Sequence, residues 1–333
     1  MAQSALAYPT RARRSAPNAI RVSPDNFNRA ESDMVFASVV KDGGLGKFVH
    51  NRELVPVDFP IVRPNRDTLY SMAVFDLDAG TVTITLPDPG KRFMSMQVID
   101  EDQYSPRVIY GGGTFTFTKE QIRTRYISIG VRTFVDPNDT EDLRQVHALQ
   151  DSIMVEQRSR GSFEVPNWDL QSQRKVRDAL LALGETVPDT KGMFGPRYHV
   201  DPVRHLIGTA IGFGGNPEKD AFSLNVIPPK NDGVTMHKLR VTDVPVDGFW
   251  SISIYDEQGH FVKNKFAAYT VNNITAKKDA DGSITVQFGG CDGKKPNCLD
   301  IMPAWNYTIR LYRPRRDILD GRWKFPGAEP VTK

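Results

Sequence analysis

The stretch VRPNRDTLYSMAVFDL, residues 62–77, changes character in its middle. Its second half, from Leu69 to Leu77, is dominated by large apolar side chains, which predicts a buried β-strand. Its first half instead carries two arginines, an amide and a carboxylate. Polar groups at the start of a core strand need partners, so this stretch predicts a strand and also marks a candidate site.

Alternation of polar and apolar residues continues on both sides of a central helical region. Runs rich in β-branched and aromatic residues are separated by turn signals such as Asp-Ala-Gly, Asp-Pro-Gly and Gly-Gly-Gly. The first group of runs is TLYSMAVFDL, TVTITLP, FMSMQVID, RVIYGGGTFTFT and YISIGVRTFVD, and the second is MHKLRVTDV, FWSISIYD, AAYTVNNITAK, SITVQFGG and WNYTIRLYRP. We therefore expect a mainly β protein of two antiparallel units, each resembling a β-sandwich or jelly roll.

Helices are expected at the N-terminus and between the two β units. Apolar residues recur at helical spacing after Ser23 or Asp25, after Thr140, before Gly184, and after Asp201-Pro202. The predicted organisation is a flexible arm over 1–22, an N-terminal helix with the first β domain over 23–157, a helical connection over 158–217, and a second β domain over 218–333.

Composition narrows the classes of partner. The 333 residues include 39% hydrophobic and 25% charged residues with a formal net charge of +3, which is ordinary for a protein that buries a core. The basic clusters near both ends are not interleaved with aromatic residues, so we expect no nucleic-acid partner. No apolar run approaches the roughly 20 residues that a membrane span requires.

The two cysteines bear on the cellular compartment of the protein, because a disulfide favours an oxidising one. Cys291 and Cys298 lie in the loop sequence GGCDGKKPNCL, at a spacing that favours a disulfide over two free thiols or a metal site. The first twenty residues lack the apolar core of a signal peptide. We therefore expect a periplasmic or secreted protein whose numbering begins after a leader.

The polar cluster before the core strand is the leading candidate site. Counting by two along the strand, Arg66 and Tyr70 share one face and Asp67 lies on the other. Arg66, with Asn65, would bind an anionic or carbonyl group, while Tyr70 and Asp67 would handle protons. An Arg66–Asp67 brace that only holds the strand is an equally weighted alternative.

The second β region offers fewer candidates. Tyr255 and Asn264 are expected to add polar groups to a pocket that lies between the units or at the mouth of the first. Trp250 is expected in the core, and Arg310 with Tyr312 in a surface ladder. His199 and His205 flank the start of a helix and are weak candidates for metal ligands. The alternative interpretation is that both are partly exposed imidazoles that cap the helix. No organic-cofactor motif is present.

Four stretches resemble a known pair of families. They are PNRDTLYS from Pro64, PVDGFWSISIYDEQGHFVKN from Pro245, DGSITV from Asp281 and IRLYRPRRDILDGRWKFP from Ile309. They resemble the tandem domain-of-unknown-function families 1254 and 1214, which implies two β-rich domains in one chain, often in exported bacterial proteins. The chain departs from the family pattern at Asn297-Cys298-Leu299-Asp300 and at Ala268-Tyr269.

The function expected from the sequence is that of an exported small-molecule enzyme or binder acting on an anionic or carbonyl-bearing compound without an organic cofactor. Whether it turns a substrate over stays open, because a binding pocket and a cofactor-free active site use the same residue types. The alternative is a structural or interaction module that forms a homo-oligomer through its β domains without catalysis.

Overall fold

The computed structural model describes residues 18–59 and 62–331 and divides the chain into two compact units. The first unit comprises the chain up to Arg52, Leu69–Val135 and Asp139–Glu218. The second comprises Glu53–Thr68, Asp136–Asn138 and the chain from Lys219 onward. Most of the arm expected over 1–22 lies outside the described residues. The helices of 158–217, expected as a separate connection, group with the first unit.

The first unit contains a five-stranded and a three-stranded sheet. The larger sheet has the order β1 (Val49–His50), β2 (Thr68–Asp76), β7 (Tyr126–Phe134), β4 (Met94–Asp100), β5 (Arg107–Tyr110). The smaller has the order β6 (Gly113–Phe117), β3 (Val82–Leu86), β8 (Met154–Gln157). The run RVIYGGGTFTFT is therefore two strands in two sheets, and Gly111 and Gly113 adopt positive φ at the crossing.

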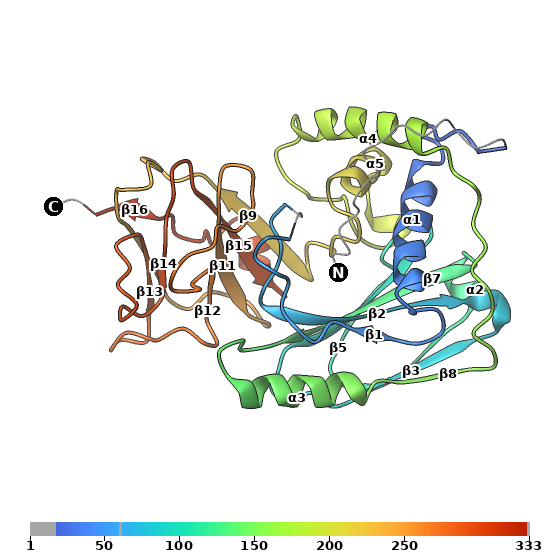
Figure 1. Cartoon of the computed structure of the whole chain (residues 1–333), viewed down its shortest axis with the longest axis horizontal. Helices are drawn as coiled ribbons and strands as arrows, with labels where there is room; N and C mark the ends of the chain where they lie inside the picture. Colours follow the sequence, from blue (N-terminus) through green and yellow to red (C-terminus); the bar gives the residue numbers. More distant parts are fainter. Residues whose placement is uncertain (1–17, 60–61, 332–333) are drawn as a thin grey trace. The chain divides into compact units, whose positions relative to one another are not determined.

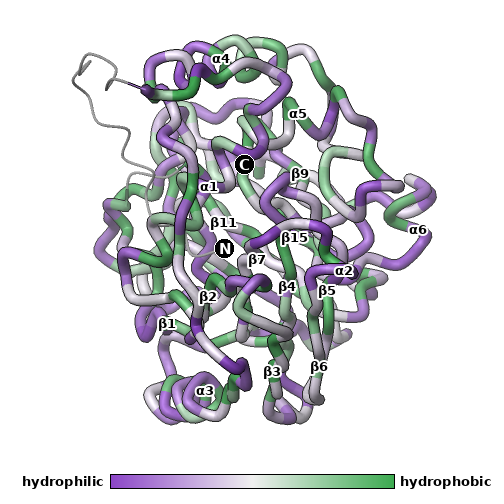
Figure 2. The backbone as a smooth tube through the Cα atoms, turned by 90° about the vertical axis from the view of Figure 1, so that its right-hand side faces the viewer, coloured by the Kyte–Doolittle hydropathy of each residue, from purple (hydrophilic) through white to green (hydrophobic). Residues whose placement is uncertain are grey.

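A layer of helices lies on the side of the large sheet that is turned away from the small one, with the first helix against the sheet and two others packed on that helix. They are α1 (Phe27–Lys41), α4 (Leu170–Gly184) and α5 (Pro202–Ile211), seen together in Figure 1. The remaining helical elements are α2 (Lys119–Ile122), α3 (Thr140–Asp151), and the 3₁₀ turns Leu77–Ala79 and Arg197–His199. Hydrophilic and hydrophobic residues are interspersed along both α3 and α4 in Figure 2, as in amphipathic helices, where each turn contributes to a polar and an apolar face.

Burial on both faces explains the sequence of β2. All nine residues of the strand are buried. Ala73 and Phe75 point into the core between the two sheets, whereas Met72 and Val74 pack against α1 on the other side. A strand covered on both faces has a nearly continuous apolar sequence, and the predicted core strand is confirmed.

Helix caps follow the sequence signals with shifts of one or a few residues. Asp201 caps α5 by accepting from the backbone amides of Val203 and Arg204, as predicted. The cap of α3 is Asp139 and not Thr140. The cap of α1 is Asn26, without a side-chain hydrogen bond, and not Ser23 or Asp25.

The second unit contains two four-stranded sheets and the short helix α6 (Arg316–Leu319). One sheet has the order β12 (Thr270–Asn272), β11 (Trp250–Tyr255), β15 (Asn306–Tyr312), β9 (Ala221–Val226). The other has the order β14 (Cys298–Leu299), β13 (Ile284–Phe288), β10 (His237–Val241), β16 (Glu329–Pro330). The strand pairs in these sheets are antiparallel except β13–β14, which is parallel. The mainly β prediction is thus confirmed.

The core of the second unit lies between its two sheets. Trp250, Ile252 and Ile254 of β11 join Val286 and Phe288 of β13 in one apolar cluster. The expectation that Trp250 is a core residue is confirmed, since its side chain is 3% exposed. The opposite face of β11 carries Ser251, Ser253 and Tyr255, all buried as well. Something other than the sandwich core must therefore cover that polar face.

Candidate functional site

The polar face of β11 is covered by the segment that precedes the first core strand. Residues Glu53–Thr68 group with the second unit, although the rest of β2, from Leu69 onward, belongs to the first. Arg63 has positive φ, and its backbone N–H donates to the Gly259 carbonyl at 2.7 Å. The candidate cluster of residues 63–67 is therefore assembled on the sheet of β11 and β15.

Asp67 is buried against β11. Its Oδ2 accepts a hydrogen bond from the Ser251 hydroxyl at 2.6 Å. Burial raises the pKa of the Asp67 carboxyl, and this is opposed by the Ser251 hydrogen bond, the charge of Arg310 and a hydrogen bond from Asn272. The carboxyl thus lies among groups that hold it in place.

Arg310 on β15 is the centre of the network. Its guanidinium donates to the Ser253 hydroxyl at 3.1 Å, to the Arg63 carbonyl at 2.8 Å and to the Tyr255 hydroxyl at 2.8 Å. It is only 8% exposed, and Tyr312 on the same strand is buried too. The expectation of a surface ladder is wrong, because residues 63–67 cover this face of the sheet.

Asn65 and Tyr255 bind the backbone of the segment. The Asn65 amide donates to the Tyr312 hydroxyl at 2.7 Å, while its Oδ1 accepts from the backbone N–H of Asp67 at 2.8 Å. The Tyr255 hydroxyl donates to the Pro64 carbonyl at 2.8 Å. The polar groups of these side chains therefore form hydrogen bonds that hold a sharply turned backbone in place.

Arg66 and Arg63 are half-buried and point to the aromatic residues of the same unit. Arg66 donates to the Val55 carbonyl, and its guanidinium lies 5.5 Å from the centre of the Tyr269 ring. Arg63 donates to Asn306 and Thr308 at 2.7 and 2.9 Å. Burial lowers the pKa of both guanidinium groups.

The charges around this cluster do not balance. Across residues 18–59 and 62–331, neither Arg63, Arg66 nor Arg310 forms an ion pair with a carboxylate within 4.0 Å. Asp67 is the carboxylate bound into the network, and burial favours its neutral form. The cluster therefore carries an excess of positive charge.

Tyr70 belongs to the other unit. It lies on β2 with 3% of its surface exposed, and the guanidinium of Arg132 on β7 is 5.7 Å from its ring centre. Tyr70 and Arg66 do not share a strand face as predicted, because β2 begins at Thr68 and residues 66 and 67 precede the strand. The structure brings Asp67, Arg66, Asn65 and Tyr255 together in one unit and Tyr70 into the other.

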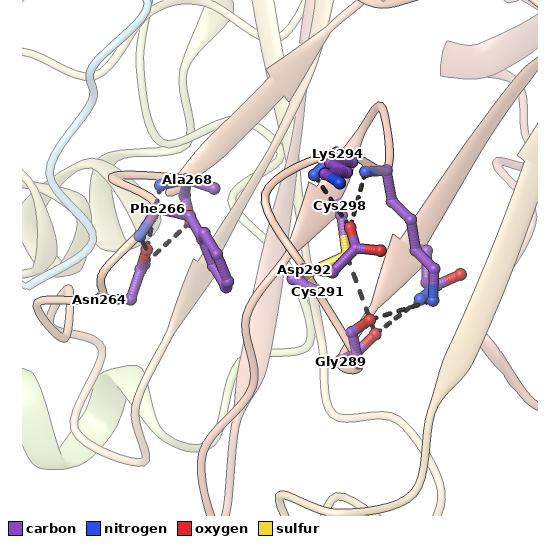
Figure 3. Close-up of a disulfide and its surroundings, with 11 residues drawn as sticks. Asn264, Phe266, Ala268, Gly289, Cys291, Asp292, Lys294 and Cys298 are labelled. Carbon is purple, nitrogen blue, oxygen red and sulfur yellow. Dashed lines mark hydrogen bonds between the residues drawn. A yellow bond between two sulfur atoms is a disulfide. The ribbon is translucent and has the colours of Figure 1, made fainter.

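Asn264 shapes a loop of the second unit (Figure 3). Its Oδ1 accepts from the backbone N–H groups of Phe266 and Ala268, each at 3.1 Å, and its amide donates to the Ala268 carbonyl at 3.1 Å. Its polar atoms are therefore used within residues 264–268, and its effect on any ligand would come through the position of this loop.

The two histidines proposed as weak metal candidates lie in different settings. Both ring nitrogens of the buried His205 face carbonyl oxygens, of Met193 at 2.9 Å and of Asp102 at 3.0 Å. The expectation of a partly exposed imidazole is wrong for this residue. His199 ends a 3₁₀ turn. Within the described part of the chain, no three His, Cys, Asp or Glu residues are grouped to hold a metal ion.

Cys291 and Cys298 form a disulfide whose Cα atoms are 5.7 Å apart (Figure 3). Cys298 begins the edge strand β14, so the bridge ties this strand to the preceding loop. A disulfide is compatible with an oxidising compartment. No helix in the described residues is long and apolar enough to span a membrane.

Arg310 and the serines of β11 were not predicted from the sequence as members of the cluster. A signal was present, because Ser251 and Ser253 alternate with core residues on a strand, and Arg310 and Tyr312 do so on another. What could not be inferred was that the two strands pair, with Ser251 opposite Arg310.

Comparisons with known proteins identify both β regions. Residues 45–157 match the family model described as "Protein of unknown function (DUF1254)", and residues 229–316 match "Protein of unknown function (DUF1214)". The chain therefore carries these two domains in tandem, which confirms the resemblance found in its sequence. No curated protein matches the chain.

Two solved structures share the fold. The VPA0106 protein from Vibrio parahaemolyticus is 17% identical with a TM-score of 0.74, and the match covers 93% of this chain and 98% of that one. An uncharacterised protein from Burkholderia cenocepacia is 11% identical with a TM-score of 0.53, covering 92% and 86%. At such identities the likeness concerns the fold alone.

Proposed function

We propose that the protein is an exported small-molecule binder or enzyme that takes an anionic, carboxylate-bearing compound at Arg66 and Arg63 without an organic cofactor. The observation that carries this proposal is the excess of positive charge on residues 63–67 and β15. Three arginines gather there, and the single carboxylate of the network, Asp67, lies in a site that favours its neutral form.

An excess of positive charge on half-buried arginines favours the binding of an anionic ligand. Removing a guanidinium from water costs free energy that a counterion recovers. Arg310 is fully engaged by a hydroxyl, a carbonyl and a phenol, whereas Arg66 donates one hydrogen bond among the described residues. A guanidinium has five N–H donors in a planar fork that matches a carboxylate. Arg66 is therefore the anchor in this proposal.

In this proposal the remaining residues have different roles. Asn65 and Tyr255 position the segment, because their polar groups bind its backbone and its neighbours. Asp67 follows the anchor in the chain and is the titratable group of the cluster, and burial raises the pKa of its carboxyl. Tyr70, in the other unit, is left out of this site.

Ligand binding by Arg66 variants tests the proposal. Succinate, phosphate and the neutral analogue succinamide would be titrated into the full chain and followed by calorimetry. We expect succinate to bind, succinamide to bind at least tenfold more weakly, Arg66→Gln to weaken succinate at least tenfold, and Arg66→Lys to restore part of it.

A matched control is available in the same unit. Arg322 is exposed and paired with Asp317 and Asp320, so Arg322→Gln should leave succinate binding unchanged. Equal effects of Arg322→Gln and Arg66→Gln, or equal binding of succinate and succinamide, would overturn the proposal.

The alternative of a structural or interaction module also has a specific observation in its favour. Asp67, Asn65, Tyr255 and Arg310 all hold the segment in place, as a brace would. If no anion binds and sedimentation shows a stable homo-oligomer, this second function replaces the first.

A further inference from the structure

A pocket lies at the seam between the two sheets of the second unit. Strands β12 and β14 are each the end strand of their sheet. The pocket has a volume of about 510 Å³, and its lining includes Thr270 and Val271 from β12 and Cys298 from β14. This volume is within the range of small-molecule sites, roughly 300–1,000 Å³.

Two stiff loops complete the walls of this seam pocket (Figure 3). The Asn264 side chain fixes residues 266–268 by binding two backbone N–H groups and one carbonyl. On the other side, the disulfide closes the loop from Cys291 to Cys298. Asp292 stiffens that loop further, because its Oδ1 accepts from the backbone N–H groups of Lys294 and Lys295, each at 2.9 Å.

The two loops meet at Gly293. This glycine has φ of +77°, and a Cβ at its position would come within 3.1 Å of the Phe266 ring. Phe266 and Gly293 both line the pocket. The disulfide loop and the Asn264 loop are thus held against each other, so the shape of the pocket depends on both.

The lining combines an apolar part with a cation. Phe266 and Val271 supply the apolar surface, and Lys295 is the charged residue of the lining. Lys295 donates to the Gly290 carbonyl and forms no ion pair among the described residues. A second ammonium, of Lys265, lies 4.8 Å from the centre of the Phe266 ring. Asp292, the acidic residue of the disulfide loop, accepts hydrogen bonds from backbone N–H groups, which lower the pKa of its carboxyl, and the charge of Lys295 lowers it further.

We propose that the seam pocket is a second binding site, for a small carboxylate whose apolar body packs on Phe266 and Val271 and whose carboxylate pairs with Lys295. The disulfide acts as a positioning element, since it holds β14 and the loop that carries Lys295. Strand β14 pairs with β13 over only two residues, so the sheet alone fixes this wall weakly. This site is independent of the proposed function at Arg66.

Benzoate and its neutral isostere benzamide are suitable probes, followed by amide chemical shifts of the full-length protein. We expect saturable benzoate shifts at Ala268, Thr270 and Val271, and at least tenfold weaker binding of benzamide. Lys295→Gln should weaken benzoate at least fivefold and leave benzamide unchanged. Lys238→Gln, at an exposed lysine of β10 in the same unit, is the matched control and should change neither.

The disulfide is tested by the double variant Cys291→Ser/Cys298→Ser, which should weaken benzoate at least fivefold. If this variant fails to fold, Lys295→Gln in the intact protein still decides the proposal. Benzoate shifts that are absent, or Lys295→Gln that behaves like Lys238→Gln, would overturn it. Arg66→Gln separates the two sites, because it should weaken succinate binding at least tenfold yet leave benzoate shifts at Thr270 intact.

Discussion

The carboxylate of Asp67 accepts a hydrogen bond from the Ser251 hydroxyl at 2.6 Å, across a separation of 184 residues. This bond joins a segment from the first half of the chain to the central strand β11 of the second unit. It accounts for the polar residues in front of the first core strand. They cover a sheet face that carries serines, a tyrosine and an arginine.

Asp67→Ala should destabilise the second unit. The substitution leaves the Ser251 hydroxyl without its acceptor and removes the carboxylate from the vicinity of the buried Arg310. Loss of a buried polar partner of this kind costs about 2–4 kcal/mol, to be measured by urea denaturation. Ser251→Ala, which removes one hydrogen bond, should cost about 1 kcal/mol. If both Asp67→Ala and Ser251→Ala left the free energy of unfolding nearly unchanged, the stabilising role of this hydrogen-bond network would be contradicted.

Arg310→Met should lower the free energy of unfolding more than Arg66→Gln, because Arg310 braces the segment whereas Arg66 is the proposed ligand anchor. Arg310 donates to Ser253, to Tyr255 and to the Arg63 carbonyl, so its replacement should cost about 2–3 kcal/mol of unfolding free energy. Arg66 is half-buried and donates to one carbonyl, so Arg66→Gln should cost about 1 kcal/mol or less. If Arg66→Gln is the more destabilising variant, Arg66 is the brace.

Stability of the first unit should fall as the pH rises from about 4 to about 7. Asp33 on α1 is buried, which raises its pKa to about 7, against the effect of its hydrogen bond from the Trp168 indole at 2.8 Å. Between the unfolded pKa of 3.8 and the folded value, the folded state holds a proton that the unfolded state has released. Stability therefore decreases with rising pH over this window.

Asp33→Asn tests this dependence, because an amide keeps an oxygen for Trp168 and cannot ionise. We expect the variant to be more stable than the parent at pH 8 by about 1–3 kcal/mol, with little difference at pH 4. Thermal denaturation at both pH values measures the effect. A parent and variant with parallel pH profiles would contradict the assignment to Asp33. Asp100, whose pKa burial also raises to about 7, should keep part of the slope in the variant.

Removing the disulfide should loosen β14. The sequence separation of 7 between Cys291 and Cys298 makes a short loop, for which loop closure contributes about 2–3 kcal/mol. The double serine variant should lose that much stability and should be cut by trypsin after Lys294 sooner than the parent, whereas the Lys295–Pro296 bond resists trypsin in both. Mass spectrometry of the fragments identifies the site, and cleavage at an unchanged rate would contradict a structural role for the bridge.

Much of the local structure could be predicted because it depends on neighbouring residues. Alternation in FWSISIYD placed Trp250, Ile252 and Ile254 on one face, and they form part of the core. The Asp201-Pro202 pair marked the start of α5. The continuous apolar run after Leu69 marked a strand buried on both faces. Strand alternation, helix capping and the burial pattern of a strand all depend on residues that are close in sequence.

Other features depended on which distant segments meet. The alternation rule could not show that β2 begins at Thr68, and it therefore placed Arg66 and Tyr70 on one strand face. The chain turns at Arg63, and residues 63–67 bind β11 and β15, whereas Tyr70 packs in the other unit. Contacts such as Asn65 to Tyr312, across 247 residues, have no signature in either local sequence.

The residues alone were thus enough to infer a mainly β protein with two β-rich domains and a cysteine pair spaced for a disulfide. Each of these follows from short-range geometry, which the backbone and the side-chain pattern impose wherever the segment lies. The covering of the polar face of β11, the burial of Arg310 and the pocket between β12 and β14 emerged only from the folded chain. They arise because long-range packing brings together side chains whose polar groups must find partners once water is excluded.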